Sequence, residues 1–187
     1  MEDLFLRIEK TLEAGYRGWD GAKQFEGTGE RLRRLVDELC WPSIMIEVAL
    51  AKCFKAVFSD EYDEMLVSGP TEVWVLCPHH LLPCHLSVFI GYIPKGKVLG
   101  LSKFSRISTI LGKRPIMQEQ YSRELAEAVW EYLEPEGVGV RVIGRHGCML
   151  VRGIKQGVDI STSILKGSFK TDPKVREEFY ANVNSRR

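Results

Sequence analysis

The first sixty residues alternate apolar and polar side chains with the spacing of amphipathic helices. Apolar residues recur on one helical face from residue 3, and Leu32 begins a second series at positions i, i+3, i+4 and i+7. Pro42 ends that series, and Ser43 can cap a third helix. We therefore predict a mainly helical N-terminal region over residues 1–60. Its helices are expected at residues 3–14, 32–39 and 44–58, with a glycine-rich loop over 15–29.

Beyond residue 60 the hydrophobic period changes from that of helices to that of strands. Val73, Val75 and Cys77 alternate with a second set of side chains, as expected of a strand with one buried face. Tight turns such as Pro94-Lys95-Gly96-Lys97 separate the later elements. The predicted strands cover residues 71–77, 86–93, 138–144, 149–154 and 158–165, and the predicted helices cover 103–112, 118–133 and a last segment that begins at Asp172-Pro173.

This pattern and the length of 187 residues predict one domain of the α+β class with an antiparallel sheet. The net charge of +1 gives no support to a nucleic-acid or membrane-surface partner. No apolar run reaches the ~20 residues that span a bilayer, and the first residues do not resemble a signal peptide. Five cysteines, an odd number, argue against a disulfide scaffold. We therefore expect a cytoplasmic protein without membrane or nucleic-acid partners.

The small net charge conceals a segregation of charge along the chain. Residues 73–118 contain six basic residues and no acidic one, and residues 137–158 contain four basic residues and no acidic one. Two acid-free blocks of this kind indicate a binding site for an anion, provided that the fold brings them together. Charge alone leaves open the alternative of a chance distribution with lysines on turns.

Cysteine and histidine gather at two predicted strand ends. Cys77-Pro78-His79-His80 follows one strand, and His146-Gly147-Cys148 follows another. Zinc binds Cys and His at such local spacing, with three protein ligands in a catalytic site and four in a structural one. Cys77, His80 and Cys148 form the three-ligand set, to which His79 or His146 could add a fourth ligand. The alternative interpretation is that these are buried cysteines and hydrogen-bonded core histidines.

Further polar residues fit the recognition of a phosphorylated ligand. Ser102, Lys103 and Arg106 lie at the start of a predicted helix and offer one hydroxyl and two cations to phosphate, although a solvated helix start would look the same. Arg152, predicted on a strand after the second metal motif, is another phosphate candidate. Gln118-Glu119 ends the longer acid-free block, and its carboxylate could accept paired N–H bonds from an edge such as that of guanine. Glutamate is also favoured in a first helical turn for helix stability alone.

At this point the residues resemble the GTP cyclohydrolase I family. The resemblance covers roughly residues 28–183, and its motifs occur in the expected order and spacing. The matching motifs are Cys77-Pro78-His79-His80-Leu81-Leu82-Pro83, Tyr92-Ile93-Pro94, Gly100-Leu101-Ser102-Lys103, Arg114-Pro115 with Gln118-Glu119, His146-Gly147-Cys148, and Arg152-Gly153.

The resemblance implies a tunnelling fold, with antiparallel sheets and helices on one side, that assembles into an oligomeric β-barrel. It implies a homodecamer of two pentamers with active sites between subunits. The implied reaction converts GTP and water to 7,8-dihydroneopterin triphosphate and formate, and residues 61–187 would form the catalytic core. The implied roles are zinc binding by Cys77, His80 and Cys148; catalysis by His79 and His146; guanine binding by Gln118 and Glu119; and triphosphate binding by Ser102, Lys103, Arg106, Arg152 and Arg31.

The chain departs from the family pattern at several points. Pro78 stands where the family has glutamate, and Gly29 stands where proline is usual before Arg31. Gln120-Tyr121-Ser122 replaces the usual Arg-Leu-Thr, and the N-terminal helical region is short. These differences leave three alternatives beside the zinc-dependent enzyme: an enzyme of the same fold acting on another purine or pterin, a structural zinc module, and an inactive subunit that binds GTP.

Overall fold

The computed structural model describes residues 3–186. The chain divides into two compact units, Met1–Trp41 and Pro42–Arg187, and each is described by itself. No helix among the described residues is long and apolar enough to cross a bilayer.

The N-terminal unit consists of α1 (Leu4–Gly15), the short 3-10 helix η1 (Ala22–Phe25) and α2 (Thr28–Leu39). The carboxylate of Glu9 accepts hydrogen bonds from the backbone N–H groups of Gly27 at 2.9 Å and Gly29 at 2.6 Å. These bonds tie α1 to the first turn of α2. The two predicted helices are present, while the predicted loop includes η1 and gives way to α2 four residues before Leu32.

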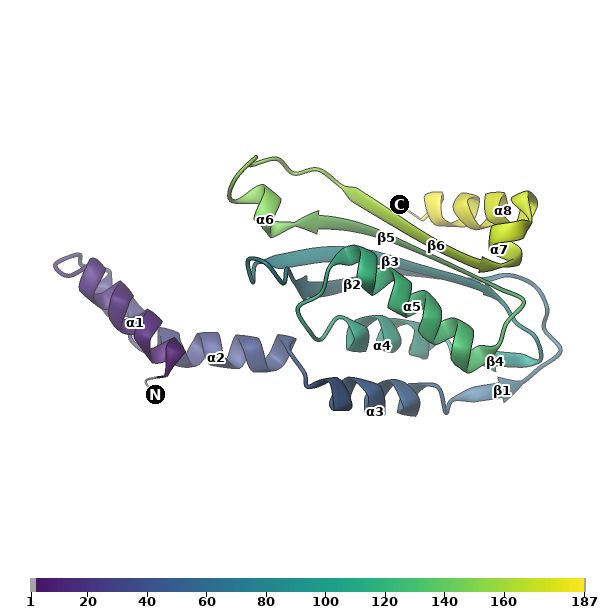
Figure 1. Cartoon of the computed structure of the whole chain (residues 1–187), viewed down its shortest axis with the longest axis horizontal. Coiled ribbons are helices and arrows are strands. Elements are labelled where there is room, and N and C mark those ends of the chain that lie inside the picture. Colours follow the sequence, from purple (N-terminus) through teal and green to yellow (C-terminus); the bar gives the residue numbers. More distant parts are fainter. Residues whose placement is uncertain (1–2, 187) are drawn as a thin grey trace. The chain divides into compact units, whose positions relative to one another are not determined.

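The larger unit is built on a four-stranded antiparallel sheet in the order β2-β3-β5-β6 (Figure 1). Two short strands, β1 and β4, form a separate antiparallel pair. Within the described residues, β2 and β6 are the outer strands of an open sheet. The strands are β1 (Val57–Ser59), β2 (Leu66–Leu76), β3 (Pro83–Ile93), β4 (Lys97–Leu99), β5 (Gly137–His146) and β6 (Ile160–Gly167).

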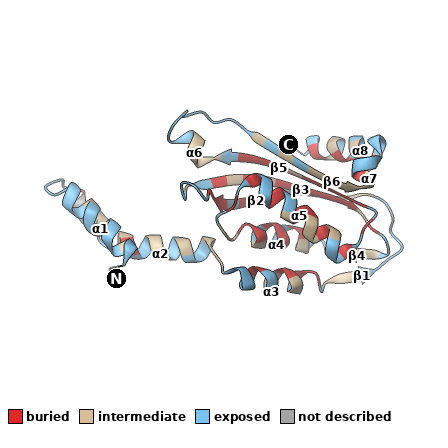
Figure 2. Cartoon of the chain, viewed as in Figure 1, coloured by how far each residue is buried: buried red, intermediate tan, exposed pale blue. Residues whose placement is uncertain are grey.

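Helices α4 and α5 cover one face of this sheet, where most of the buried residues gather (Figure 2). The even-numbered side chains of β3, such as Leu86 and Val88, are fully buried on that face. Burial of such apolar side chains contributes about 1.5–3 kcal/mol each to folding. The helices of the unit are α3 (Ser43–Cys53), α4 (Ser102–Leu111), α5 (Gln118–Leu133), α6 (Gly147–Leu150), α7 (Ser168–Thr171) and α8 (Pro173–Asn184).

Helices α7 and α8 pack on part of the opposite face, which is a detail that the sequence pattern did not indicate. Phe169 and Phe179 lie against the sheet where Gly91 and Gly139 leave room for their rings. A Cβ atom at Gly139 would lie 2.5 Å from the Phe169 ring, so glycine is needed for this close approach. The predicted α+β class with an antiparallel sheet is confirmed.

Two predicted segments differ from the structure. The third helix ends at Cys53, and residues 57–59 form β1, because Val57 and Phe58 pair with β4 instead of continuing the helix. Residues 149–154 are not a strand: α6 occupies their start, and a loop follows. Gly153 and Lys155 have φ values of 59° and 53°, which extended strands do not adopt.

Candidate active site

The turn after β2 brings a thiol and two imidazoles together. The N–H of Cys77 donates to the carbonyl of Leu82 at 2.9 Å, and the N–H of Leu81 donates to the carbonyl of Cys77 at 2.8 Å. Within this closed turn, Sγ of Cys77 lies 3.5 Å from Nδ1 of His80 and 3.9 Å from Nδ1 of His79. The local sequence therefore positions these groups before any partner strand is considered.

The second motif reaches the same place through strand pairing. Residue His146 lies opposite Cys84 in the β3–β5 register, so β5 ends beside the Cys77–Pro83 turn. A Cβ atom at Gly147 would lie only 2.5 Å from the backbone oxygen of Pro83, and glycine therefore permits this approach. Cys148 follows at once, in α6.

Cys77, His80 and Cys148 form a cluster whose ligand atoms all lie within 4.8 Å of one another. Two sulfurs and one imidazole nitrogen are donors that zinc prefers, and three protein ligands are the number found in catalytic zinc sites. Partial burial and then the neighbouring Cys77 sulfur raise the pKa of the Cys148 thiol. A divalent cation would relieve the repulsion between two adjacent thiolates, so the residues fit a metal such as zinc.

His146 is not among the clustered ligand atoms, and its ring contacts a buried amide. Its Nε2 lies 2.8 Å from Oε1 of Gln118. The amide nitrogen of Gln118 donates to the carbonyls of Val142 at 3.2 Å and Ile160 at 3.0 Å, and to the hydroxyl of Thr162 at 3.2 Å. Because these acceptors fix the amide orientation, Oε1 accepts a hydrogen bond from the N–H at Nε2 of His146. The arrangement places a ring proton on Nε2 of His146 and leaves Nδ1 outside this hydrogen bond.

The surroundings of Gln118 hold it in one position. Its side chain is 2% exposed, and its backbone carbonyl accepts from the hydroxyl of Ser122 at 2.8 Å. A Cβ atom at Gly144 would lie 2.2 Å from Oε1 of Gln118, so the absent side chain makes room for the amide. The sequence did not single out Gly144 or Thr162 as residues of the site. The only available signal was Gly144 itself, a glycine within a strand pattern.

The other residues predicted near the metal differ in their placement. His79 is exposed, with its ring 6.2 Å from that of His80. Arg152 lies in the loop after α6, where its Nη1 is 2.5 Å from Nε2 of His80. Glu119 is exposed in the first turn of α5, next to Gln118. The Gln118 side chain itself is directed into the core through its hydrogen bonds, so it does not share the exposed setting of Glu119.

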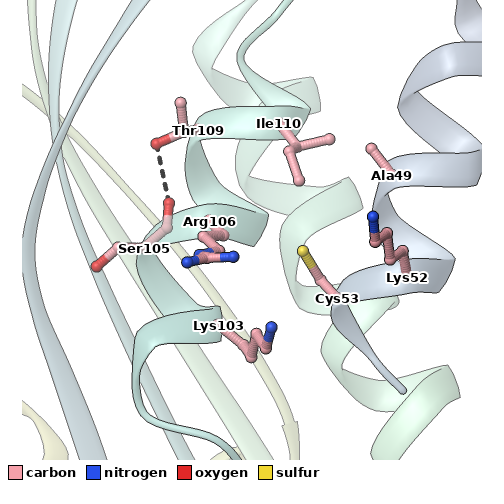
Figure 3. A pocket seen from close by; sticks show the side chains of 8 residues that line it. All are labelled: Ala49, Lys52, Cys53, Lys103, Ser105, Arg106, Thr109 and Ile110. Carbon is pink, nitrogen blue, oxygen red and sulfur yellow. Dashed lines mark hydrogen bonds between the residues drawn. The ribbon is translucent and has the colours of Figure 1, made fainter. Parts of the chain in front are cut away.

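Two of the predicted phosphate-binding residues line a cavity of about 420 Å³ between α3 and α4 (Figure 3). These are Lys103 and Arg106, while Ser102 is exposed at the start of α4. Arg31 belongs to the N-terminal unit, where its guanidinium donates to the carbonyl of Gln24 at 3.0 Å and the hydroxyl of Thr28 at 2.8 Å.

The start of α4 and the metal cluster lie towards opposite ends of the sheet. The N–H of Leu99, three residues before Ser102, donates to the hydroxyl of Tyr92 at 3.0 Å. Tyr92 lies eight residues along β3 from Cys84, which pairs with His146. At 3.2–3.4 Å per residue Tyr92 and Cys84 are about 26 Å apart, but α4 runs back along the sheet: the hydroxyl of Ser105 lies 3.2 Å from that of Thr71, which pairs with Val88, only four residues from Cys84. The structure therefore brings Cys77, His80, Cys148 and Arg152 together, and Ser102 and Lys103 lie outside this group, farther along the sheet.

Comparisons with known proteins show which family this chain resembles. The sequence model of the family "GTP cyclohydrolase I" matches residues 18–184. A GTP cyclohydrolase 1 of Hahella chejuensis is 47% identical over 133 residues, which cover 71% of each chain. A GTP cyclohydrolase 1 of Drosophila melanogaster is 44% identical over 132 residues, which cover 70% of this chain and 41% of the fly protein.

Solved structures with similar backbones include an archaeosine synthase QueF-like protein in the apo form. It is 21% identical with a TM-score of 0.44, and the match covers 58% of this chain and 96% of that one. A dihydroneopterin aldolase of Vibrio cholerae, described as putative, is 10% identical with a TM-score of 0.44, and the match covers 56% and 98% of the two chains. The match to the family over residues 18–184 and the identity to its curated members show that this chain belongs to the GTP cyclohydrolase I family.

Proposed function

We propose that this protein is a zinc-dependent GTP cyclohydrolase I, which converts GTP and water to 7,8-dihydroneopterin triphosphate and formate. The observation that carries the proposal is the Cys77–His80–Cys148 cluster beside a histidine held by a buried amide. Zinc bound by these three residues would supply Lewis acidity at C8 of the purine. The remaining chemistry falls to side chains of the protein.

His146 is the general acid for the purine ring. Protonation of N7 makes C8 electrophilic, and an imidazole is a common general acid for such a proton transfer. The hydrogen bond from Nε2 to Gln118 leaves Nδ1 as the atom that gives and regains the proton. We assign Gln118 the role of orienting His146, and we assign contact with the guanine edge to the exposed carboxylate of Glu119.

His79 is the acid for the sugar. Opening of the ribose ring requires a proton on the ring oxygen, and His79 is an exposed imidazole on the same turn as two of the metal-binding residues. Arg152 contacts Nε2 of His80 in this structure. Metal binding through Nδ1 of His80 would place the ring proton on Nε2, so the Arg152 guanidinium would turn to another acceptor, for which we propose a substrate phosphate.

We propose that a second copy of the chain completes the active site, as the family resemblance implies. Within one chain the first turn of α4 is displaced along the sheet from the metal cluster: the hydroxyl of Ser105 lies 3.2 Å from that of Thr71, and Thr71 pairs with Val88, four residues or about 13 Å along β3 from Cys84. We propose that Ser102, Lys103 and Arg106 of one subunit bind the triphosphate of a GTP whose purine lies at the metal cluster of another. Arg31 would serve the phosphates in the same way. The open outer strands β2 and β6 support assembly into the homodecamer with a closed barrel that the family resemblance implies.

Formate release tests this function. Zinc-loaded protein is incubated with GTP, and the products are assayed for formate and for a fluorescent oxidised pterin. Stoichiometric appearance of both supports the proposal, whereas absence of product at saturating metal refutes it and favours a different purine or pterin substrate. We expect the reaction to take place in the cytoplasm, which cell fractionation would test.

A structural zinc module is the competing function. It would need a fourth closed ligand, but Nε2 of His146 is engaged by Gln118, and His146 is absent from the cluster of ligand atoms. Retention of zinc by His146→Ala supports the catalytic site, and stoichiometric loss of zinc would favour the structural one.

A further inference from the structure

The cavity between α3 and α4 carries a third cation that the family motifs do not include. Lys52 lies on α3 and extends towards the cavity from the side opposite Lys103 and Arg106 (Figure 3). The other lining residues are neutral: Ala49, Cys53, Ser105, Thr109 and Ile110. A volume of about 420 Å³ lies within the range of small-molecule sites.

The positive charge of this cavity is uncompensated by protein groups. No acidic side chain lines it, and across residues 3–186 no ion pair joins Lys52, Lys103 or Arg106 to a carboxylate. Like charges that gather without a counter-ion repel one another, and a polyanion in the cavity would relieve this repulsion.

The position of Lys52 on α3 is fixed by packing on both sides of it. Ala49, Lys52 and Cys53 follow the i, i+3, i+4 spacing, so they share the helix face that looks onto the cavity. Cys53 is buried, and the adjacent Phe54 stacks on Tyr132 of α5 with ring centroids 4.2 Å apart. The backbone next to Lys52 is therefore held, while the exposed ammonium group retains the freedom to meet a ligand.

We propose that Lys52 is a further substrate-binding residue, which acts with Lys103 and Arg106 on the polyphosphate chain of the nucleotide. This inference rests on the proposed function, because it takes the ligand of the cavity to be the triphosphate of GTP. A compact ammonium charge suits phosphate oxygens. Since three cations line the cavity, binding strengthens with the number of phosphates, and the contribution of Lys52 is largest for a triphosphate.

The test measures binding of 7-deazaguanosine nucleotides to the zinc-loaded full-length protein by isothermal titration calorimetry. These analogues lack N7, so they offer the guanine edge and phosphates without the chemistry at C8. Lys52→Gln is expected to weaken binding of the triphosphate about fivefold to tenfold and of the monophosphate less than twofold. Lys52→Arg retains binding. Lys55→Gln is the matched control, because Lys55 is exposed three residues away and does not line the cavity.

Kinetics with GTP give an independent readout. Lys52→Gln is expected to raise KM for GTP by the same roughly fivefold to tenfold factor as the loss of triphosphate affinity. It leaves kcat unchanged, since the contact with the phosphates is equally strong in the ground and transition states. Equal triphosphate affinities for wild type and Lys52→Gln would overturn the inference, as would an equal loss in Lys55→Gln. If wild type releases formate but shows no dependence on Lys52, only this inference fails. Triphosphate binding that depends on Lys52 without formate release would support the cavity and refute the cyclohydrolase function.

Discussion

Replacement of Gln118 by methionine tests whether this side chain orients His146. Methionine preserves the length and approximate volume of glutamine but removes every hydrogen bond of its amide. In the wild type the two amide hydrogens are shared among three acceptors, and Oε1 accepts a further bond from His146. A hydrogen bond contributes about 1 kcal/mol net, so we expect the variant to lose about 2–4 kcal/mol of unfolding free energy.

Catalysis should fall because His146 loses the acceptor that fixes its tautomer and ring orientation. General acid–base catalysis contributes about 10²–10⁴-fold to the rate, and partial loss of orientation should therefore lower kcat roughly 10- to 100-fold. Formate release measures kcat, urea unfolding measures stability, and zinc content verifies that the metal cluster is intact. KM for GTP should change little, because the Gln118 side chain is buried away from the substrate.

Gln120→Met is the matched control on the same helix. Gln120 is exposed and makes one side-chain hydrogen bond, to Glu124 at 2.8 Å. Its replacement should change stability by no more than about 0.5 kcal/mol and leave kcat unaltered. A wild-type kcat in Gln118→Met would refute the orienting role. An increase in KM with unchanged stability would instead show that Gln118 contacts the base.

Three further outcomes follow from the structure. Gly147→Ala would place a Cβ atom 2.5 Å from the rigid backbone oxygen of Pro83, so this variant should retain less zinc on dialysis and lose about 1–3 kcal/mol of unfolding free energy. Cys148→Ala should abolish stoichiometric zinc binding, whereas His146→Ala should retain the metal; the zinc content of the purified variants measures both. Hydrogen bonds from Gly29 and Gly27 lower the pKa of Glu9 below its ordinary 4.5. The stability that the Glu9 carboxylate gives the N-terminal unit is therefore complete above pH 4.5 and is lost as the pH falls through the lowered pKa. Protection of the Gly29 amide against hydrogen exchange would report this loss.

Each of these three predictions has its own control and its own contradicting result. Gly15→Ala adds a Cβ atom with no heavy atom within 4 Å and should leave zinc retention unchanged. Full zinc retention in Gly147→Ala, or zinc loss in His146→Ala, would contradict the geometry given for the cluster. Glu9→Gln should remove the pH dependence of Gly29 protection, and its persistence would assign that dependence to another group.

Local patterns predicted the parts of the site that local structure builds. The Cys77–His80 spacing sufficed because a closed turn needs no distant partner. Helix α5 was predicted over its observed bounds because its apolar periodicity is a local property of the sequence. The contact of Gln118 with His146 depends on how α5 packs on β5. No local sequence pattern specifies that packing. The sequence predicts residues 149–154 as one of two strands around a turn at 155–157, but the positive φ of Gly153 breaks the extended backbone.

Gly29 has a consequence for engineering by family consensus. The family resemblance favours proline at this position, and a consensus design would introduce it. The structure forbids that exchange in isolation, because proline lacks the N–H that reaches Glu9, and a Cβ atom would lie 2.7 Å from the backbone oxygen of Phe5. Positions 5, 9 and 29 therefore form one epistatic unit, in which a residue favourable in relatives becomes harmful unless α1 is redesigned with it.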